Sequence, residues 1–326
     1  MTSGRRYCLI SPCRDEARYA RRTLDAVTRQ AEPPACWIIV DDGSTDETPA
    51  ILAEYAARYP YIHVVTRTDR GSRNVGPGVV DAFYDGYATI DPGDFDFMCK
   101  LDLDLDLPPR YFSTLMDRMA SNPRLGTCSG HPYFFSHGDP TREVAFPLSP
   151  GIGVVSEAIG SENAVGAAKF YRMNCFRQIG GFVRGIMWDG IDGHRCRQLG
   201  WIARSWDDPE LRFLHMRPMG SSQKNWWTGR VRHGAGQYFM GTTPVWMLAS
   251  SLYRMTRRPR VIGGLAMLYG FTKSLVSRAP RYEDPEFRRF LRRYQWACLF
   301  RGKSAATDAL NAQQKSLWLP DRSPRI

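Results

Sequence analysis

The chain has 326 residues, of which 43% are hydrophobic and 24% charged, and its formal net charge is +11. This composition excludes disordered, collagen-like and coiled-coil proteins, and the length fits one large domain or a catalytic domain with an appendage. The charge is uneven, because residues 209–326 hold 21 Lys and Arg against 6 Asp and Glu, whereas residues 1–208 carry a net −4. A basic C-terminal part can meet phosphorylated ligands, nucleic acid or an anionic membrane surface.

Strand and helix patterns alternate along the first half of the chain. Strands are predicted over residues 7–11, 37–41, 62–65 and 95–101, and helices over 16–29, 45–56, 79–90 and from 109 onward. This alternation predicts an α/β fold, with a mostly parallel sheet flanked by helices. Ligands of such sheets bind beyond the carboxyl ends of the strands, so the residues that follow strands are the candidate site residues.

The pattern becomes less regular after residue 124. Strands are predicted over residues 126–135, 163–171, 202–205 and 211–215, a connection over 143–162, and helices over 175–179 and 190–199. From residue 220 the chain is basic, aromatic and helical in pattern. We therefore predict a catalytic domain over residues 1–218 and a basic, mostly helical extension over 219–326.

The eight cysteines favour a reduced, cytoplasmic protein. None forms a Cys-x-x-Cys pair, which argues against a zinc site, and several lie in apolar runs as small buried residues. The apolar run over residues 7–10 is too short for a signal-peptide core, and no run is long enough to span a bilayer. We therefore expect no export.

Three aspartates alternate with leucines over residues 101–106. In a strand this alternation places Asp102, Asp104 and Asp106 on one face. Adjacent carboxylates repel one another, and a hard divalent cation, Mg²⁺ or Mn²⁺, would offset that repulsion. The alternative is an exposed strand edge with the leucines facing the core. The position at the end of a predicted central strand favours metal ligands.

A second acidic motif, Asp-Asp-Gly-Ser-Thr-Asp, follows the strand over residues 37–41. Residues 44–46 are good capping types for the helix that follows. Capping does not account for the doubled acid, Asp41 and Asp42, at the end of the strand. A carboxylate there can accept a hydrogen bond from a nucleotide base or a ribose hydroxyl.

Together these motifs resemble glycosyltransferase family 2, over residues 6–215. That family opens with a strand and a Pro-x-x-Asn-Glu segment, matched here by residues 12–16 with Asp15 in place of Asn. The Asp-Asp-Gly-Ser-Thr-Asp motif is matched in full by residues 41–46, the metal-binding Asp-x-Asp by Asp102 and Asp104, and a later Gly-Gly-Phe by residues 180–182.

The resemblance implies a GT-A (Rossmann-like) fold and an inverting, metal-assisted transfer, of hexosyltransferase type, from a UDP- or GDP-sugar. It implies that Asp102 and Asp104 hold Mg²⁺ or Mn²⁺. The residues implied in nucleotide binding are Pro12, Arg14, Glu16, Asp41, Asp42 and Asp102. Arg73, in a glycine-rich loop, either approaches the diphosphate or is a surface residue.

An inverting transfer also needs a general base for the acceptor hydroxyl. In the family this is the Asp of a Glu-Asp pair that precedes a helix ending in Gly. The matching stretch ends at Gly200, and Trp188 stands where the family usually has Glu. The spacing favours Asp189. Asp192 is the alternative, and it is equally explained as an acid near a helix N-terminus.

Three later residues have both functional and structural explanations. His215 ends a short apolar strand, where it completes the metal site or is simply structural. Trp226 and Trp227 lie where processive members carry Gln-x-x-Arg-Trp, and Trp226 replaces the Arg, so the motif does not decide between processive and single addition. The two tryptophans are candidates to stack on an acceptor sugar, and the alternative is a core or interfacial role.

The basic extension contains two apolar patches, over residues 245–253 and 261–276, separated by an Arg-rich segment. Apolar helices flanked by Arg and aromatic residues suit a membrane interface, and the alternative is an ordinary helical subdomain. We expect peripheral attachment to the cytoplasmic face of the cell membrane and a lipid-linked saccharide as acceptor, as in polysaccharide or glycolipid assembly.

Two other functions would each fit part of the sequence. A nucleotidyltransferase of related fold usually opens with a glycine-rich loop, which residues 11–16 lack. A basic module that binds nucleic acid or membranes would explain the extension. It would not explain the acids at Asp41, Asp42, Asp102 and Asp104, which repel phosphate. We therefore expect no nucleic-acid partner.

Overall fold

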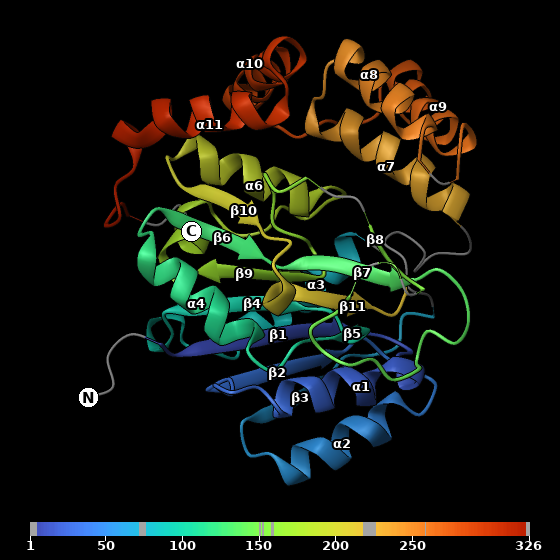
Figure 1. The fold of residues 1–326 in the computed structure, drawn as a ribbon, viewed down its shortest axis with the longest axis vertical. Coiled ribbons are helices and arrows are strands. Elements are labelled where there is room, and N and C mark those ends of the chain that lie inside the picture. The colour runs from blue at the N-terminus through green and yellow to red at the C-terminus, as the bar shows by residue number, and fades with distance from the viewer. Residues whose placement is uncertain are drawn as a thin grey trace. The chain divides into compact units, whose positions relative to one another are not determined.

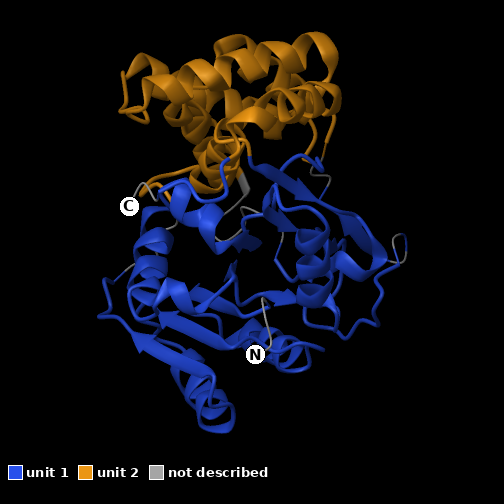
Figure 2. Ribbon diagram, turned by 90° about the vertical axis from the view of Figure 1, so that its left-hand side faces the viewer, with its two compact units in different colours: residues 1–181, 201–218, 319–326 blue, residues 182–200, 219–318 orange. Residues whose placement is uncertain are grey.

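The computed structural model describes residues 5–71, 76–149, 151, 153–157, 160–217, 226–257 and 259–323, without the side chain of Trp226. The chain forms two compact units (Figure 2). We call them the sheet unit (Met1–Gly181, Trp201–Pro218 and Leu319–Ile326) and the helical unit (Phe182–Gly200 and Met219–Trp318). The predicted boundary between residues 218 and 219, as a division between folding domains, stays a prediction.

A seven-stranded sheet forms the centre of the sheet unit, in the order β10-β6-β9-β4-β1-β2-β3 (Figure 1). Its strands are β1 (Tyr7–Cys13), β2 (Cys36–Asp41), β3 (Ile62–Thr66), β4 (Phe97–Leu101), β6 (Leu125–Ser129), β9 (Ala168–Arg172) and β10 (Ile202–Ser205). Only β9 runs against its neighbours β4 and β6. The predicted mostly parallel α/β sheet is therefore confirmed.

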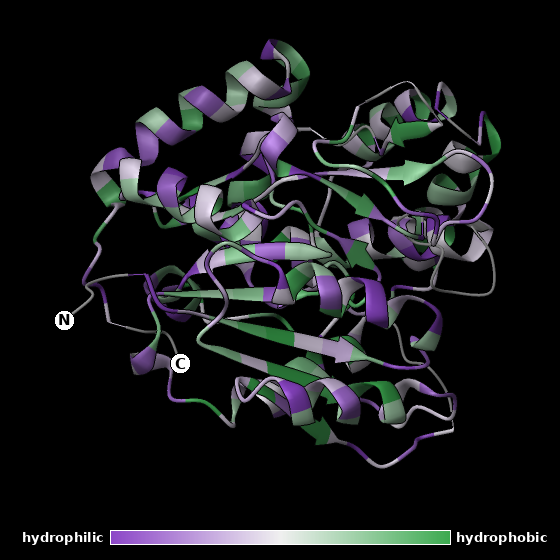
Figure 3. Cartoon of the chain, turned by 60° about the horizontal axis from the view of Figure 1, so that its bottom comes forward, coloured by the Kyte–Doolittle hydropathy of each residue, from purple (hydrophilic) through white to green (hydrophobic). Residues whose placement is uncertain are grey.

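Helices α1 (Ala17–Thr28), α2 (Thr48–Arg58), α3 (Pro77–Tyr87), α4 (Tyr111–Ser121) and α5 (Met173–Gln178) belong to the same unit. Strands β1 and β2 are apolar and buried along almost their whole length, as expected for parallel strands covered on both faces. Figure 3, coloured by hydropathy, shows green, hydrophobic segments along strands of the sheet. Helix α3 packs closely on them because Gly86 has no side chain. A Cβ there would lie 2.8 Å from a methyl carbon of Val40.

A second sheet has the order β5-β11-β7-β8, with strands β5 (Leu105–Asp106), β7 (His131–Phe135), β8 (Val154–Ser156) and β11 (Arg212–His215). The predicted single strand over residues 126–135 is therefore wrong, because β6 and β7 belong to different sheets. The break falls at Gly130, where a Cβ would lie 1.8 Å from the Leu211 carbonyl oxygen. The predicted connection over residues 143–162 likewise contains β8.

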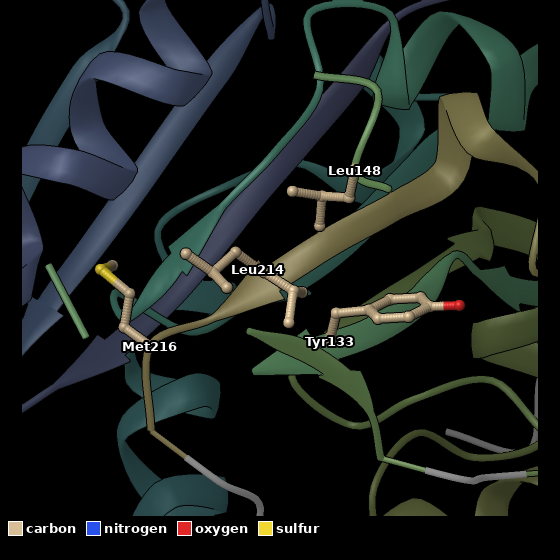
Figure 4. Close-up of a cluster of buried hydrophobic side chains, with 5 residues drawn as sticks. Tyr133, Leu148, Leu214 and Met216 are labelled. Carbon is tan, nitrogen blue, oxygen red and sulfur yellow. The ribbon is translucent and has the colours of Figure 1, made fainter. Parts of the chain in front are cut away.

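A hydrophobic cluster lies beside this second sheet. It consists of Tyr133, Leu148, Val154, Leu214 and Met216 (Figure 4). Side chains alternate between the two faces of a strand. Because Leu214 and Met216 both point into the cluster, His215 between them is directed to the opposite face. The hydrophobic cluster thus fixes the orientation of a predicted site residue.

The helical unit contains α6 (Trp188–Gln198), α7 (Trp226–Met240), α8 (Pro244–Met255), α9 (Ile262–Val276), α10 (Pro285–Arg301) and α11 (Lys303–Gln313). The predicted helical character of the extension is confirmed. Two of these helices begin with a side-chain cap. The backbone N–H of Trp246 donates to the Thr243 hydroxyl, and the backbone N–H of Phe287 donates to the Asp284 carboxylate. None of the helices in the described ranges combines the length and hydrophobicity that crossing a bilayer requires.

Glycines let α7 and α9 approach each other at backbone distance. A Cβ at Gly234 of α7 would lie 1.9 Å from the Met267 carbonyl oxygen, and a Cβ at Gly270 of α9 would lie 2.0 Å from that of Val231. Contacts this close exclude any side chain at either position.

Alanine at Gly234 should destabilise the helical unit, because its methyl group would overlap the Met267 carbonyl oxygen. We expect the free energy of unfolding to fall by about 1–3 kcal/mol, the usual range for an overpacked interior. Gly263→Ala is the matched control, because the nearest atoms to its Cβ lie 3.7 Å away, and it should leave stability nearly unchanged. Urea denaturation followed by circular dichroism measures both variants. Equal effects would show that α7 and α9 do not pack this closely.

Candidate active site

The carboxyl ends of three parallel strands meet at one edge of the central sheet. Cys13 at the end of β1 pairs with Asp41 at the end of β2, and Ile10 of β1 pairs with Lys100 near the end of β4. The segments that follow these strands carry the predicted nucleotide and metal residues. The sheet thus brings together residues that lie up to about ninety positions apart in the sequence.

The loops after β1 and β2 are joined by reciprocal hydrogen bonds. Asp15 has a left-handed backbone (φ 52°); its N–H donates to the Ser44 hydroxyl, and its carboxylate accepts from the Thr45 N–H at 2.8 Å. Glu16 donates its N–H to the Thr48 hydroxyl at 2.8 Å. Asp15, which stands where the resembling family has Asn, therefore has a structural role. Pro12, at the end of β1, is half-buried.

The two acids that end β2 already have partners. Asp41 is buried and accepts the Ser44 N–H at 3.0 Å, as in an ordinary turn. Asp42 forms ion pairs with Arg67, at 2.5 Å, and with Arg70. Arg14, also buried, donates to the Asp42 carbonyl oxygen at 2.7 Å and pairs with Asp69. Three arginines therefore lie around the predicted nucleotide residue Asp42, and only Arg14 belongs to a sequence motif described above.

The three alternating aspartates do not share a strand face, so this prediction is wrong. Strand β4 ends at Leu101, and the chain enters β5 of the second sheet only at Leu105. Each acid instead meets its own basic partner. Asp102 pairs with Lys100, Asp104 with Arg217, and Asp106, which is buried, with Arg22 at 2.7 Å. Separate partners relieve the repulsion that a metal was expected to relieve.

Asp104 is the centre of a buried group of charges that we call the Asp104 cluster: Asp104, His215, Arg217 and Glu16. Oδ2 of Asp104 lies 2.7 Å from Nε of Arg217 and 3.4 Å from Nε2 of His215. The other side of the Arg217 guanidinium lies 2.7 Å from Oε1 of Glu16. Backbone geometry supports the same contact, because the Met216 N–H donates to the Asp104 carbonyl oxygen at 2.9 Å. Three segments distant in sequence therefore meet in this cluster.

The pKa values of the cluster follow from burial and from these contacts. Burial alone would raise the pKa of Asp104, but attraction and hydrogen bonds from His215 and Arg217 outweigh it and lower that pKa. Burial opposes the protonation of His215, yet Asp104 and then Glu157 raise its pKa above the ordinary 6.5. The pKa of Arg217 is likewise raised by Asp104 and Glu16 against the effect of burial. Asp104, His215 and Arg217 therefore favour their charged forms.

Asp104 is the residue that best fits a role as a ligand of a divalent metal. Its Oδ1 is buried and has no hydrogen-bond partner among the described residues, as an oxygen left for a further ligand would be. Within the described ranges, no group of three or more His, Cys, Asp and Glu side chains is arranged to hold a metal. Asp102 is turned to Lys100, and Arg217 occupies the second oxygen of Asp104. The predicted metal role of Asp102, Asp104 and His215 stays a prediction.

Sequence reasoning missed Arg67, Arg70, Glu157 and Arg217. Arg67 and Arg70 follow β3, the strand next to β2, so the rule that ligands lie beyond strand ends could have found them. Arg217 follows His215 by two residues. Glu157, 3.8 Å from Nδ1 of His215, left no signal in the sequence. Its place depends on β8, which the sequence did not predict.

Both candidate bases lie on α6 of the helical unit. Asp189 is in the first turn and is half-buried. Burial lowers the pKa values of Arg232 and His233 of α7, and the negative charge of Asp189 partly opposes this effect. Asp192 is only 1% exposed and accepts the Gly193 N–H. Trp227 is 39% exposed, with its ring 6.5 Å from that of Tyr269. Arg73 lies outside the described residues, as does the side chain of Trp226.

Replacing His215 with Gln should remove a pH-dependent part of the stability of the metal-free protein. The folded pKa of His215 is above 6.5, so its contribution is fully present below pH 6.5 and is lost as the pH rises through the folded value. We expect His215→Gln to cost more free energy of unfolding at pH 6 than at pH 9, measured by urea denaturation with a chelator. A cost that is independent of pH would contradict the ion pair with Asp104.

The chain was compared with known proteins. The model of the family "Glycosyl transferase family 2" matches residues 8–180, more than half of the chain. An uncharacterized protein of Mycobacterium tuberculosis is 31% identical over 140 residues, which are 43% of this chain and 38% of that protein. A poly-beta-1,6-N-acetyl-D-glucosamine synthase of Staphylococcus epidermidis is 26% identical over 121 residues, 37% of this chain and 27% of that protein. The matches thus span less than two fifths of the length of these relatives.

Among solved structures, GalNAc-T7 with UDP, GalNAc and Mn²⁺ has a TM-score of 0.51 at 12% identity and covers 89% of this chain and 56% of that chain. This likeness concerns the fold alone. It agrees with a mixed α/β core of the GT-A type. The sheet edge described above carries the motifs of residues 12–16, 41–46 and 102–104. With the family model matched over β1 to α5 and its motifs gathered at one edge of the sheet, the chain belongs to glycosyltransferase family 2.

Proposed function

We propose that the chain transfers a sugar from a UDP- or GDP-sugar to an acceptor hydroxyl with inversion, assisted by Mg²⁺ or Mn²⁺. The observation that carries this proposal is the buried Asp104 at the carboxyl edge of the sheet, one oxygen of which has no hydrogen-bond partner among the described residues. The GalNAc-T7 structure, whose description includes UDP and Mn²⁺, supports it at the level of the shared fold. Family membership sets aside the nucleotidyltransferase and the non-enzymatic module.

The nucleotide would bind over the loops after β1 and β2. The residues that we assign to it are Pro12, Arg14, Glu16, Asp41, Asp42 and Asp102, with Arg73 as a candidate beside the diphosphate. Arg67 and Arg70 join this set because they hold the Asp42 carboxylate. Guanidinium groups with fixed geometry suit both carboxylate and phosphate. When the nucleotide binds, its phosphates would compete with the Asp42 carboxylate for Arg67 and Arg70.

Asp102, Asp104 and His215 would hold the divalent ion. When bound, the ion would stabilise the negative charge on the departing nucleoside diphosphate. For this, Asp102 must share its carboxylate with Lys100 and the ion. Arg217 neutralises Asp104 in the ligand-free protein, so we expect its guanidinium to compete with the ion for Oδ2.

Asp189 would accept the proton of the acceptor hydroxyl. The half-buried position of Asp189 in the first turn of α6 suits this role better than that of Asp192, whose carboxylate is buried and hydrogen-bonded to the backbone. Trp227, and with it Trp226, would stack on the acceptor sugar.

The acceptor that we propose is a lipid-linked saccharide at the cytoplasmic face of the cell membrane. Two findings support this: the partial similarity to a poly-beta-1,6-N-acetyl-D-glucosamine synthase, and the excess of basic residues after residue 209. A basic surface favours acceptors and membranes that carry phosphate. The product would then be a polysaccharide or a glycolipid.

A nucleoside diphosphate should stabilise the protein against heat only when Mn²⁺ is present. In a panel of UDP and GDP with Mn²⁺ or a chelator, we expect a shift in Tm of several degrees for one nucleotide, as for a ligand at about a hundred times its Kd. Asp104→Asn should abolish the metal-dependent part of the shift. Asp106→Asn, the neighbouring acid that pairs with Arg22, is the matched control and should keep it. The same response in both variants would exclude Asp104 as a ligand.

Asp189→Asn should lower kcat by a factor of about 10²–10⁴, the usual contribution of a general base, while nucleotide stabilisation stays intact. Activity is measured as sugar transfer with the donor that the nucleotide panel identifies. Asp192→Asn should retain most of the activity per folded molecule. If the losses are reversed, Asp192 is the base and the assignment by spacing is wrong.

A further inference from the structure

The helical hairpin formed by α8 and α9 exposes an unusual amount of apolar side chain. Val245, Leu248 and Leu252 of α8 and Ile262, Leu265 and Tyr269 of α9 are each between 47% and 55% exposed. In both helices the spacing is i, i+3, i+7, which places the three residues on one stripe of the helix surface. Single exposed hydrophobic residues are ordinary, but two such stripes on adjacent helices are not.

The two stripes belong to one close-packed element. Gly264 of α9 lies against α8, and a Cβ there would be 2.3 Å from the Ser251 carbonyl oxygen. Met247 and Ser251 of α8, and Met267 and Phe271 of α9, are buried within the helical unit. Each helix therefore buries one face and leaves a different, apolar face uncovered. Figure 1 shows the two helices side by side.

The charge around the stripes has one sign. Residues 244–278 contain six Lys and Arg and no Asp or Glu, and residues 211–282 contain no acid at all. Arg257, Arg260, Lys273 and Arg278 are exposed, and none of these four forms an ion pair with a described residue. Such uncompensated positive charge is stabilised by a negatively charged partner.

We propose that the exposed face of the α8–α9 hairpin docks on an anionic lipid surface, with the two apolar stripes entering the acyl boundary and the flanking basic residues at the phosphate level. This inference rests on the proposed location at the membrane surface, and it names the part of the chain that contacts the membrane. An apolar face bordered by Lys, Arg and tyrosine is the pattern of a helix that lies in the bilayer interface. Tyr253 and Tyr269 are exposed and suit the headgroup region.

A second copy of the chain is a poorer occupant. A symmetric contact brings the same surface of each copy together, so the basic residues around the hairpin would face one another. Like charges across an interface weaken it unless acids intervene, and this segment supplies none. An acidic protein partner would also satisfy the charge, and the vesicle measurement separates the two, because a chain that needs such a partner would bind neither kind of vesicle.

Binding to vesicles tests the proposal directly. The full chain is sedimented with vesicles of phosphatidylcholine alone and with vesicles that contain about one third phosphatidylglycerol. We expect binding to the anionic vesicles, weakened by raised salt, and little binding to the neutral ones. Leu248→Ser with Leu265→Ser should lower the partition coefficient about tenfold or more, because both side chains would no longer enter the bilayer. Arg257→Gln with Lys273→Gln should lower it by a similar factor.

Phe300→Ser is the matched control, because Phe300 of α10 is the most exposed large hydrophobic residue among those described outside the hairpin. We expect this variant to bind vesicles as the unaltered chain does. The proposal is overturned if no vesicles bind, if neutral vesicles bind equally well, if the hairpin variants bind unchanged, or if Phe300→Ser has as large an effect. It is also overturned if the chain dimerises in gel filtration and the leucine variant does not, since the face would then hold a second copy.

The failure of this proposal and of the proposed transferase function can be told apart. Stabilisation by a nucleoside diphosphate and Mn²⁺ is measured on the same hairpin variants, and it should be retained because Leu248 and Leu265 lie outside the predicted donor site. Asp104→Asn should lose that stabilisation and keep its binding to vesicles. Circular dichroism and Tm of each variant establish that it is folded. Each result therefore bears on one of the two proposals alone.

Discussion

The buried charge of Asp104 is the constraint on which the arrangement of the candidate site depends. A carboxylate removed from water must be compensated, and here the compensation comes from Arg217 and His215. Arg217 in turn reaches Glu16, so that the segments after β1, β4 and β11 are held by one network. Removing a single partner would leave an uncompensated charge in the interior. The loops that form the edge of the sheet are therefore positioned by electrostatics as well as by the strands.

The same network accounts for the acids of the proposed metal site in the ligand-free protein. Arg217 supplies positive charge to Asp104 where a divalent ion would supply it, and Lys100 does so for Asp102. Oδ1 of Asp104, which has no hydrogen-bond partner in the part of the chain that the structure describes, marks the direction in which a further ligand would bind. In the proposed mechanism, binding of the ion would exchange these protein cations for the metal ion.

Much of the fold and part of the site could be predicted from the sequence. The alternation of strands and helices gave the parallel sheet, and the motifs at residues 12–16, 41–46 and 102–104 lie at one edge of it, as strand ends require. The single face of three aspartates failed because periodicity does not show where a strand leaves its sheet, and β4 ends at Leu101. Glu157 and Arg217 could not be predicted as members of the site, since their positions depend on pairing in the second sheet. Composition indicated the basic character of the extension, but only exposure identified its uncovered face.

In the proposed function, the edge of the sheet around Asp104 turns over a nucleotide sugar with the help of a divalent metal. Release of nucleoside diphosphate is measured from a panel of UDP- and GDP-sugars, with Mn²⁺ or with chelator, by the unaltered chain and by Asp104→Asn. We predict release from one class of donor with Mn²⁺ only, and a loss of release in the variant. Release that persists in Asp104→Asn, or that does not depend on metal, would overturn the proposed function.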